Sequence, residues 1–378
     1  MKNLSVSQRS QLVAEKLKIK LENIANFSLD PNQIMGRNCE NMIGVTQIPL
    51  GIAGPIAVKL PAREYYLPLA TTEGALIASV NRGCKATRLS GGIRVKVELK
   101  GVTRAPVFKV NNLAEAEKLI TWIKKNFNQL KQQVEATSRY LKLLDIEPFI
   151  TGKNLFLRFS YDTAEAMGMN MATIATQQAV SLIELKLKVK CVSLSGNFCV
   201  DKKASWLNFI QGRGKCVWAE ARLKKAVVKQ VLKTTPEKIV EVVLRKDFVG
   251  SAMSGSLGFN GHFANIVAAL FLATGQDMAH VVEGSLGITT AELETNGDLY
   301  FSVYLPSLML GTVGGGTGLA TQKEALAILG LGQGKKGEAL ELAVIVGAAV
   351  LAGELSLTAA LAAGHLVKAH EKLGRGSK

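Results

Sequence analysis

The chain has 378 residues, enough for about two or three domains with a substantial buried core. Hydrophobic residues make up 48% and charged residues 20% of the sequence, which excludes disordered, collagen-like and coiled-coil classes. The formal net charge of +16 calls for either an anionic partner or a basic solvated surface. The lysine clusters carry no zinc-finger or RNA-binding signature, so we predict no nucleic-acid partner.

Cysteine usage and hydropathy predict a cytoplasmic protein. The five cysteines are odd in number and form no C-x-x-C pair, which favours reduced thiols over a disulfide framework. The first residues, MKNLSVSQRSQL, lack the apolar segment of a signal peptide. The longest apolar run, 342–353, is bounded by Glu341 and Glu354 and is shorter than the roughly 20 residues of a membrane span, so we predict no membrane partner.

The first hundred residues predict a helical arm followed by a region in which glycines interrupt short apolar segments. Residues 5–25 have helical spacing, and a loop near Pro31 ends this arm. The turn at 71–74 opens an apolar helix. Residues 93–99 alternate between apolar and charged side chains, which is typical of a half-buried strand.

Residues 106–194 carry a distinct pattern of strand, helix, strand, strand, helix, strand. This order is typical of a ferredoxin-like unit with both helices on one face of a sheet. The expected strands and helices lie, in chain order, at 106–110, 113–137, 144–150, 155–161, 164–185 and 189–194. A glycine-rich, helical sequence resumes after residue 194, which indicates that 106–194 is an insertion in the larger domain.

The remainder, 206–378, is predicted to be mostly helical, with core helices at 264–274 and 342–363 and a strand at 299–305. The fold class is therefore α+β. We expect a mainly helical large domain with a central sheet, an inserted ferredoxin-like small domain and a short helical N-terminal arm. The expected boundaries are 1–38 for the arm, 39–105 with 195–378 for the large domain, and 106–194 for the small domain.

Two acids stand at helix ends. Glu73 follows two threonines at a helix start, where an acid complements the helix dipole, so spacing alone favours a structural role. Asp277, in the GQD sequence at 275–277, follows an apolar helix. It is either a nearly buried acid that needs a cation or a polar residue at the helix exit.

Two loops are candidates for chemistry. SGNFCVDKK at 195–203 follows a strand, and its adjacent acid and amines could stabilise an oxyanion or could form a solvated turn. GTVGGGTGLATQKEAL at 311–326 places glycines between a strand and a helix, where backbone N–H groups favour anions. The glycine loop matches neither the dinucleotide fingerprint nor a phosphate loop, so it is a weak motif.

The histidines give no metal site. His365 and His370 are five residues apart and point away from each other on a helix, and no zinc-ligand spacing occurs in the sequence. We therefore predict no metal. His370 could act only if the tail folded back over a site, and a surface position is the default expectation.

Seven segments together resemble one family, although each is weak alone. In this order they resemble 3-hydroxy-3-methylglutaryl-coenzyme A (HMG-CoA) reductase, in the class shared by eukaryotes and archaea, class I, without a membrane-anchoring region. The segments are ENMIG (40–44), PLATTEGALIASVNRGC (68–84), EAMGMNM (165–171), SGNFCVDKK (195–203), GQD (275–277), GTVGGGT (311–317) and LAAGHLVKAH (361–370).

The resemblance implies an NADPH-dependent four-electron reduction of HMG-CoA to mevalonate and free CoA. In the matching positions, Lys202 would hold the oxyanion and Asp277 would sit beside it. Glu73 would supply a proton during aldehyde reduction, and His370 would protonate the departing thiolate.

The resemblance also implies the binding residues. Those for the hydroxymethylglutaryl group are Arg104, Ser195, Asp201, Lys203, Lys246 and Asn265. Those for CoA are Ser79, Asn81, Arg82 and Lys233. Those for NADPH are Ser138, Arg139, Met167, Gly168, Met169, Asn170, Val313, Gly314, Gly315 and Gly316. The small domain would thus be a cofactor domain of a non-Rossmann kind, and family members form dimers with active sites between subunits and often pair into tetramers.

Two positions depart from the family pattern: Glu165 stands where Asp is usual, and Gly318 where Asn is common. Two other functions remain open. A non-redox acyl-CoA-binding protein or thioesterase would need the CoA residues without Ser138, Arg139 and the M-G-M-N run. A basic nucleic-acid-binding module would explain the charge alone.

Overall fold

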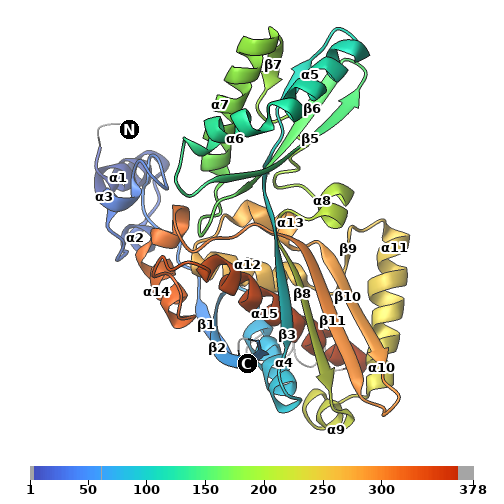
Figure 1. The fold of residues 1–378 in the computed structure, drawn as a ribbon. Coiled ribbons are helices and arrows are strands. Elements are labelled where there is room, and N and C mark those ends of the chain that lie inside the picture. The colour runs from blue at the N-terminus through green and yellow to red at the C-terminus, as the bar shows by residue number, and fades with distance from the viewer. Residues whose placement is uncertain (1–3, 61, 365–378) are drawn as a thin grey trace.

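One long sheet connects the two main parts of the molecule, which lie one above the other in Figure 1. The computed structural model describes residues 4–60 and 62–364, and within these residues the sheet has nine strands in the order β7-β4-β6-β3-β8-β11-β10-β9, with β5 paired to β6. The strands are β3 Arg94–Arg104, β4 Val107–Lys109, β5 Lys142–Thr151, β6 Asn154–Asp162, β7 Lys190–Ser193, β8 Gly214–Leu223, β9 Gly258–Phe259, β10 Gly287–Leu293 and β11 Leu299–Leu308.

The upper part, here called the small unit, comprises β4 to β7 with three helices, α5 Leu113–Lys125, α6 Phe127–Glu135 and α7 Met169–Leu187. Its strand order, β7-β4-β6-β5, is antiparallel throughout and is that of the predicted ferredoxin-like unit. A hydrophobic core of its own fills the space between these strands and helices.

Two helices of the small unit differ from the prediction. The helix expected at 113–137 is divided at Asn126, whose side chain donates to the Trp122 carbonyl and ends the first half. The helix expected from 164 begins only at Met169, because Gly168 is its N-cap with φ +90°. That backbone conformation is open to glycine and costly for other residues.

The lower part is built around α15, Glu338–Ala362, which packs on β3, β8 and β11 and against α4, Leu76–Leu89, and α12, Phe263–Thr274. By length and mean hydropathy (2.0) this helix could cross a membrane, but 89% of its most apolar window is buried inside the protein, as a core helix is. The predicted core helix is confirmed.

Glu354, which bounds the longest apolar run of the sequence, lies inside the helix, in agreement with the predicted helix at 342–363. It is fully buried within α15, and its carboxylate accepts hydrogen bonds from the N–H groups of Gly261 and His262 and from the Thr289 hydroxyl. A buried carboxylate with this many donors is satisfied, so the helix continues past it.

The prediction that 206–378 is mostly helical was incomplete, because β8, β10 and β11 of the central sheet lie there. The strand expected at 299–305 is present as part of β11. The other helical segments are α8 Trp206–Gln211, α9 Lys225–Val227, α10 Pro236–Val242, α11 Ser251–Ser254, α13 Val281–Gly284 and α14 Ala320–Ile328, with π-helical turns at Val228–Leu232 and Val243–Gly250 and 3-10 turns at Met278–His280 and Gly315–Gly318.

The N-terminal residues form the expected helical arm, in blue at the left of Figure 1, with a small apolar cluster around Val6, Ile34 and Met42. Its helices are α1 Val6–Leu17, α2 Glu22–Ala25 and α3 Pro31–Ile34. A hairpin of β1, Leu50–Lys59, and β2, Ala62–Ala70, follows the arm and was not predicted.

Strand β3 belongs to both parts. Its first half, 94–101, pairs with β8, and its last residues, 102–104, pair with β6 of the small unit. The change of partner occurs at Gly101, where the register shifts and φ is +87°. The expected division of the chain into domains near 106 and 194 stays a prediction.

Candidate active site

A lysine and an aspartate from distant segments form the centre of the candidate site. Lys202, on the loop between β7 and α8, lies with Nζ 2.7 Å from Oδ2 of Asp277, which follows α12. Partial burial raises the pKa of Asp277, but hydrogen bonds from Lys202 and from the Ala279 N–H outweigh burial, and the pKa lies below its ordinary value. Asp277 is therefore ionised at neutral pH and holds the ammonium group in place.

The loop that carries Lys202 is held from three sides. The Thr103 hydroxyl donates to the Cys199 carbonyl at 2.8 Å, and the Asn208 side chain donates to the Val200 carbonyl at 3.1 Å. The backbone N–H of Lys202 donates to Oε1 of Glu283 at 3.1 Å. These contacts fix an irregular segment in which Asn197, Val200 and Lys202 all have positive φ.

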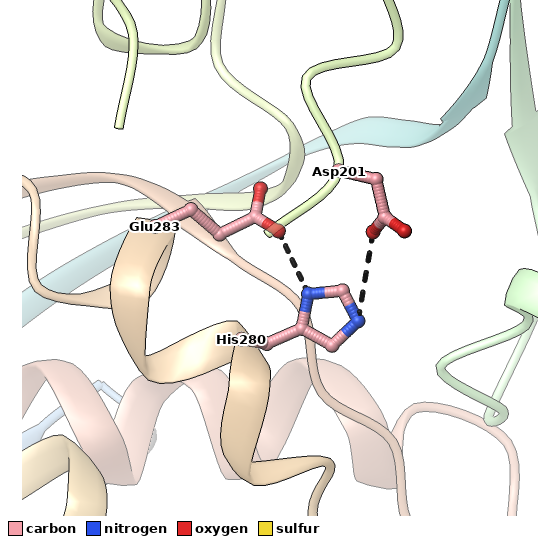
Figure 2. Close-up of side chains that lie close together, drawn as sticks. All are labelled: Asp201, His280 and Glu283. Carbon is pink, nitrogen blue, oxygen red and sulfur yellow. Dashed lines mark hydrogen bonds and ion pairs between the residues drawn. The ribbon is translucent and has the colours of Figure 1, made fainter. Parts of the chain in front are cut away.

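Behind the loop lies a buried cluster of charged residues that the sequence analysis missed. Arg213 is fully buried, and its guanidinium contacts Glu283 at 2.6 Å and Asp201 at 3.1 Å. Figure 2 shows the His280 ring between Glu283 and Asp201, with Nδ1 2.7 Å from Glu283 and Nε2 3.9 Å from Asp201. The H-x-x-E spacing of 280–283 was the available signal, because residues three apart share a helical face.

Ligand atoms of Asp201, His280 and Glu283 all lie within 4.8 Å of one another, which is metal-like geometry. However, the Arg213 guanidinium already contacts both carboxylates. A divalent cation there would be repelled by this buried positive charge at short range. We assign no metal to the group, and the absence of a metal stays a prediction.

Glu73 forms a second pair, with Asn265, apart from the Lys202–Asp277 pair. Its Oε2 accepts from Nδ2 of Asn265 at 2.8 Å, and within the described residues no hydrogen bond or ion pair joins it to Lys202 or Asp277. Asn265 is in the first turn of the 12-residue α12, whereas Asp277 follows its last turn. The two pairs therefore lie at opposite ends of a helix about 18 Å long, so one chain alone does not bring Glu73 to Lys202.

The residues expected to bind CoA lie mainly on α4. The Ser79 hydroxyl is 2.9 Å from that of Ser356 on α15, and Arg82 donates to the Ser356 carbonyl at 2.7 Å. Asn81 is exposed and accepts from the Gly54 N–H. Lys233 is exposed at the end of the π-helical turn at 228–232.

The residues expected to bind the hydroxymethylglutaryl group, except Lys246, lie near the Lys202 loop or beside Glu73. Near the Lys202 loop, Arg104 donates to the Thr173 hydroxyl, the Ser195 hydroxyl is 3.4 Å from the Cys199 sulfur, and Lys203 donates to the Asp201 carbonyl. Asn265 lies instead beside Glu73.

Lys246, the last of these residues, lies on the π-helical turn at 243–250 and pairs with Asp247 at 2.7 Å. His370 lies outside the described residues, so its expected place at the site stays a prediction.

The two expected cofactor segments lie side by side. An isolated parallel bridge joins Val313 to Ala166, and the Thr312 N–H donates to the Glu165 carbonyl at 2.8 Å. The glycines at 314–316 therefore stand next to the run Met167, Gly168, Met169 and Asn170. A Cβ at Gly314 or Gly315 would meet no atom within 4 Å, so the backbone there is open to a ligand.

Ser138 and Arg139 follow α6 in the same unit. The Ser138 hydroxyl lies 3.6 Å from the sulfur of Met171, which is on the first turn of α7. Arg139 is exposed and contacts the Tyr140 ring and hydroxyl, and within the described residues it has no carboxylate partner. Its guanidinium is thus available for a phosphate.

Comparison with known proteins accounts for this arrangement. The family model described as hydroxymethylglutaryl-coenzyme A reductase matches residues 5–375. The chain belongs to this family. It is 51% identical to the 3-hydroxy-3-methylglutaryl-coenzyme A reductase of Pyrococcus abyssi, over 99% of this chain and 93% of that protein. It is 54% identical to the enzyme of the same name from Methanocaldococcus jannaschii, over 97% and 92% of the two chains.

A solved structure with the same fold comes from Streptococcus pneumoniae. It is described as a class II 3-hydroxy-3-methylglutaryl-CoA reductase bound to NADPH, and it superposes with a TM-score of 0.71 over 95% of this chain and 97% of that chain, at 19% identity. This similarity confirms the predicted α+β fold. Membership of the reductase family confirms the predicted family and the prediction of an enzyme.

Glu165, where this reductase departs from the family pattern, has a clear structural role. Its two carboxylate oxygens accept from the N–H groups of Gly337 and Ala339, each at 2.7 Å, at the start of α15. A carboxylate at this position satisfies free N–H groups and complements the helix dipole. The Glu165 side chain therefore joins the cofactor run to the main core helix. Nothing in the structure explains Gly318.

Lys215 is a buried cation close to the same segments. It is 3% exposed on β8, and Nζ donates to the Leu310 carbonyl at 2.8 Å, just before the glycine loop. Burial lowers its pKa to about 8, although the charges of Glu165 and Asp162 partly oppose this shift. A lysine whose pKa is lower in the folded than in the unfolded chain destabilises the fold at every pH at which it is protonated in the unfolded chain.

Replacing Lys215 with methionine is expected to raise the free energy of unfolding at pH 7 by up to about 3 kcal/mol. The pKa of Lys215 is about 8 in the folded state against an ordinary 10.5, so the cost of its charge is present below pH 8. The advantage of the variant should shrink as the pH rises to 10.5. Urea denaturation of both proteins across this pH range measures it, and a pH-independent difference would contradict the assignment.

Proposed function

We propose that the chain catalyses the NADPH-dependent four-electron reduction of HMG-CoA to mevalonate and free CoA. The observation that carries this proposal is the Lys202–Asp277 pair on a loop that meets the expected cofactor run. Arg213 joins the two, because its guanidinium contacts both Asp201 of the loop and the sulfur of Met169. A positive charge over the thioester oxygen and a nicotinamide beside it are what the reaction needs.

The chain's own residues divide the chemistry as follows. The Lys202 ammonium stabilises the negative charge that develops on the carbonyl oxygen, and ionised Asp277 orients that ammonium. Glu73 donates a proton to the oxygen during aldehyde reduction, and His370 protonates the CoA thiolate as it leaves. The hydroxymethylglutaryl group is held by the cations Arg104, Lys203 and Lys246, which suit its carboxylate, and by the neutral side chains of Ser195 and Asn265.

The cofactor segments fit a dinucleotide phosphate. The open backbone at Gly314 and Gly315 allows a ligand to approach closely, Gly316 follows where its own backbone meets Gly275, and exposed Arg139 with Ser138 suits a 2′-phosphate. Met167, Gly168, Met169, Asn170 and Val313 line the rest of the site. When bound there, NADPH supplies the hydrides.

We further propose a homodimer with active sites between subunits, and we expect two such dimers to pair into a tetramer, as the family resemblance implies. Its support is that Glu73 and Lys202 lie at opposite ends of α12 in one chain, so a second copy is needed to bring them together. We place the chain in class I, since it shares half of its residues with archaeal enzymes and 19% with the class II protein. The cytoplasm is its proposed location.

The decisive experiment is an NADPH absorbance assay with HMG-CoA that also measures the CoA released. We expect two NADPH oxidised for each CoA freed. CoA release without NADPH oxidation would identify a thioesterase instead. If neither occurs, a salt-sensitive RNA complex that survives excess HMG-CoA would favour the nucleic-acid-binding function.

Replacing Arg139 with alanine is expected to weaken NADPH binding about 10- to 100-fold, because one charge-assisted contact to the 2′-phosphate is lost. NADH lacks that phosphate, so its KM should change less than about twofold. The KM values for both cofactors measure the effect. Arg222→Ala, which removes an exposed arginine paired with Glu294, serves as the control, and an unchanged NADPH-to-NADH ratio would refute the role of Arg139.

A further inference from the structure

Glu283 is a fully buried carboxylate on α13 that collects donors from several segments of the chain. Oε1 accepts from the Arg213 guanidinium at 2.6 Å and from His280 Nδ1 at 2.7 Å. The same oxygen accepts from the Lys202 N–H at 3.1 Å, and Oε2 accepts from the Asn208 side chain at 3.2 Å. The guanidinium compensates the buried negative charge, so Glu283 is a rigid acceptor.

The hydrogen bond from the Lys202 N–H to Glu283 stabilises an unfavourable backbone conformation of Lys202. Lys202 has φ +60°, a left-handed conformation that is disfavoured for residues other than glycine and persists only where the surroundings enforce it. The Lys202 N–H is bound by Glu283, while its Nζ is bound by Asp277. Because the backbone conformation sets where the side chain points, the Glu283 contact determines how Lys202 meets Asp277.

His280 extends the same network to the other member of the pair. The Glu283 carboxylate is the acceptor for the Arg213 guanidinium, so we assign the hydrogen of its contact with His280 to Nδ1. Among residues 4–60 and 62–364, Nε2 of the ring has no hydrogen-bond partner, and this buried atom lies 3.7 Å from Oδ2 of Asp277. The ring therefore stands between Glu283 and Asp277, as part of the wall against which Asp277 packs.

We propose that Glu283 is a positioning residue of this reductase, which sets the Lys202–Asp277 pair directly through the Lys202 backbone and indirectly through His280. Its kinetic consequences rest on the proposed function. Among the described residues, fully buried Glu283 bonds to Lys202, Asn208, Arg213 and His280 and to none of the expected cofactor residues, so it acts through Lys202. It should affect the rate of chemistry and leave binding largely unchanged.

Two variants separate these effects. Glu283→Gln keeps an oxygen that can accept the Lys202 N–H but removes one of the two carboxylates that pair with Arg213, leaving Asp201, and Glu283→Ala removes the acceptor. We expect kcat to fall about 10-fold in the first and about 100-fold in the second, the size expected for a displaced catalytic group. The KM for HMG-CoA and the Kd for NADPH should each change less than about threefold.

Glu338→Gln is the matched control. Glu338 is also buried, and its carboxylate accepts backbone N–H groups of Gly332 and Gly334. Removing its charge lowers stability without touching the Lys202 loop, so kcat should stay within about twofold. If Glu338→Gln lowers kcat as much as Glu283→Gln at a similar loss of Tm, the effect is general destabilisation and the proposal is overturned.

Crystal structures of the Glu283 variants test the geometry independently of activity. In Glu283→Ala we expect Lys202 to leave its positive φ and its contact with Asp277 to break. If alanine prevents folding, Glu283→Gln decides, through a change in Lys202 φ or in the Lys202–Asp277 distance. Unchanged geometry or unchanged kcat overturns the proposal. Inactivity of the unmodified protein refutes the proposed function instead, and the crystal structures still decide the role of Glu283.

Discussion

Lys202→Ala is expected to lower kcat for NADPH oxidation with HMG-CoA by about 10³-fold. In the proposed mechanism this ammonium supplies the positive charge for the oxyanion, and Asp277 holds it at 2.7 Å. Loss of one preorganised oxyanion donor costs this much because no other group can move in to replace it. Steady-state kinetics with both substrates saturating measures the change.

The variant should fold normally, because the Lys202 side chain is 38% exposed and its backbone contact to Glu283 does not need the side chain. Lys100→Ala is a suitable control, since Lys100 is 33% exposed and pairs with Glu98 on β3. Its kcat should be unchanged. Turnover of Lys202→Ala within tenfold of the unmodified enzyme would remove Lys202 from the oxyanion role.

Gly83→Ala should destabilise the protein by at least about 3 kcal/mol, at the upper end of overpacking effects. Gly83 lies on α4 where this helix meets α15, and a Cβ built there would be 1.9 Å from the Ala352 carbonyl oxygen. The clash is with backbone, so the two helices must move apart and open the core between them. The shift in the midpoint of urea denaturation measures the loss.

Gly250→Ala is the matched control for Gly83→Ala. Gly250 is also helical, but a Cβ there would lie 3.4 Å from its nearest neighbour, the Arg245 carbonyl, which is ordinary contact. Alanine should be neutral or slightly stabilising, because it lowers the entropy of the unfolded chain. Equal losses in the two variants would mean that α4 and α15 are not in backbone contact at Gly83.

Local patterns were sufficient for much of the fold. The alternation in 93–99 identified strand β3, and the helical spacing in 113–137 identified helices α5 and α6 of the small unit. Both patterns are visible because these elements are half-buried and amphipathic. The hairpin of β1 and β2 was missed where glycine and proline interrupt the alternation. Strand β8 was missed because its first residues, 214–217, are buried on both faces and include Lys215, so alternation is confined to 218–223.

The candidate site depended on non-local contacts. The motifs selected Lys202 and Asp277, and the structure places their side chains in contact, while their roles stay predictions. His280 and Glu283 share one short segment, where the H-x-x-E spacing places them on one face, but nothing local shows that they meet Arg213, which lies about 70 positions earlier, just before β8. Their burial with opposite charges makes pairing obligatory, but only the fold shows which charges pair.

The shared strand β3 has a consequence for how the molecule comes apart. The amides of Val102 to Arg104 bond to the small unit, and those up to Gly101 bond to the large sheet. If either the small unit or the large sheet unfolds, β3 loses its hydrogen-bond partners at one end. The pairing at its other end is then weakened, because residues 102–104, which pair with the small unit, directly follow those that pair with the large sheet. The two cores are therefore expected to lose protection from hydrogen exchange in one concerted event, with no stable half-melted form.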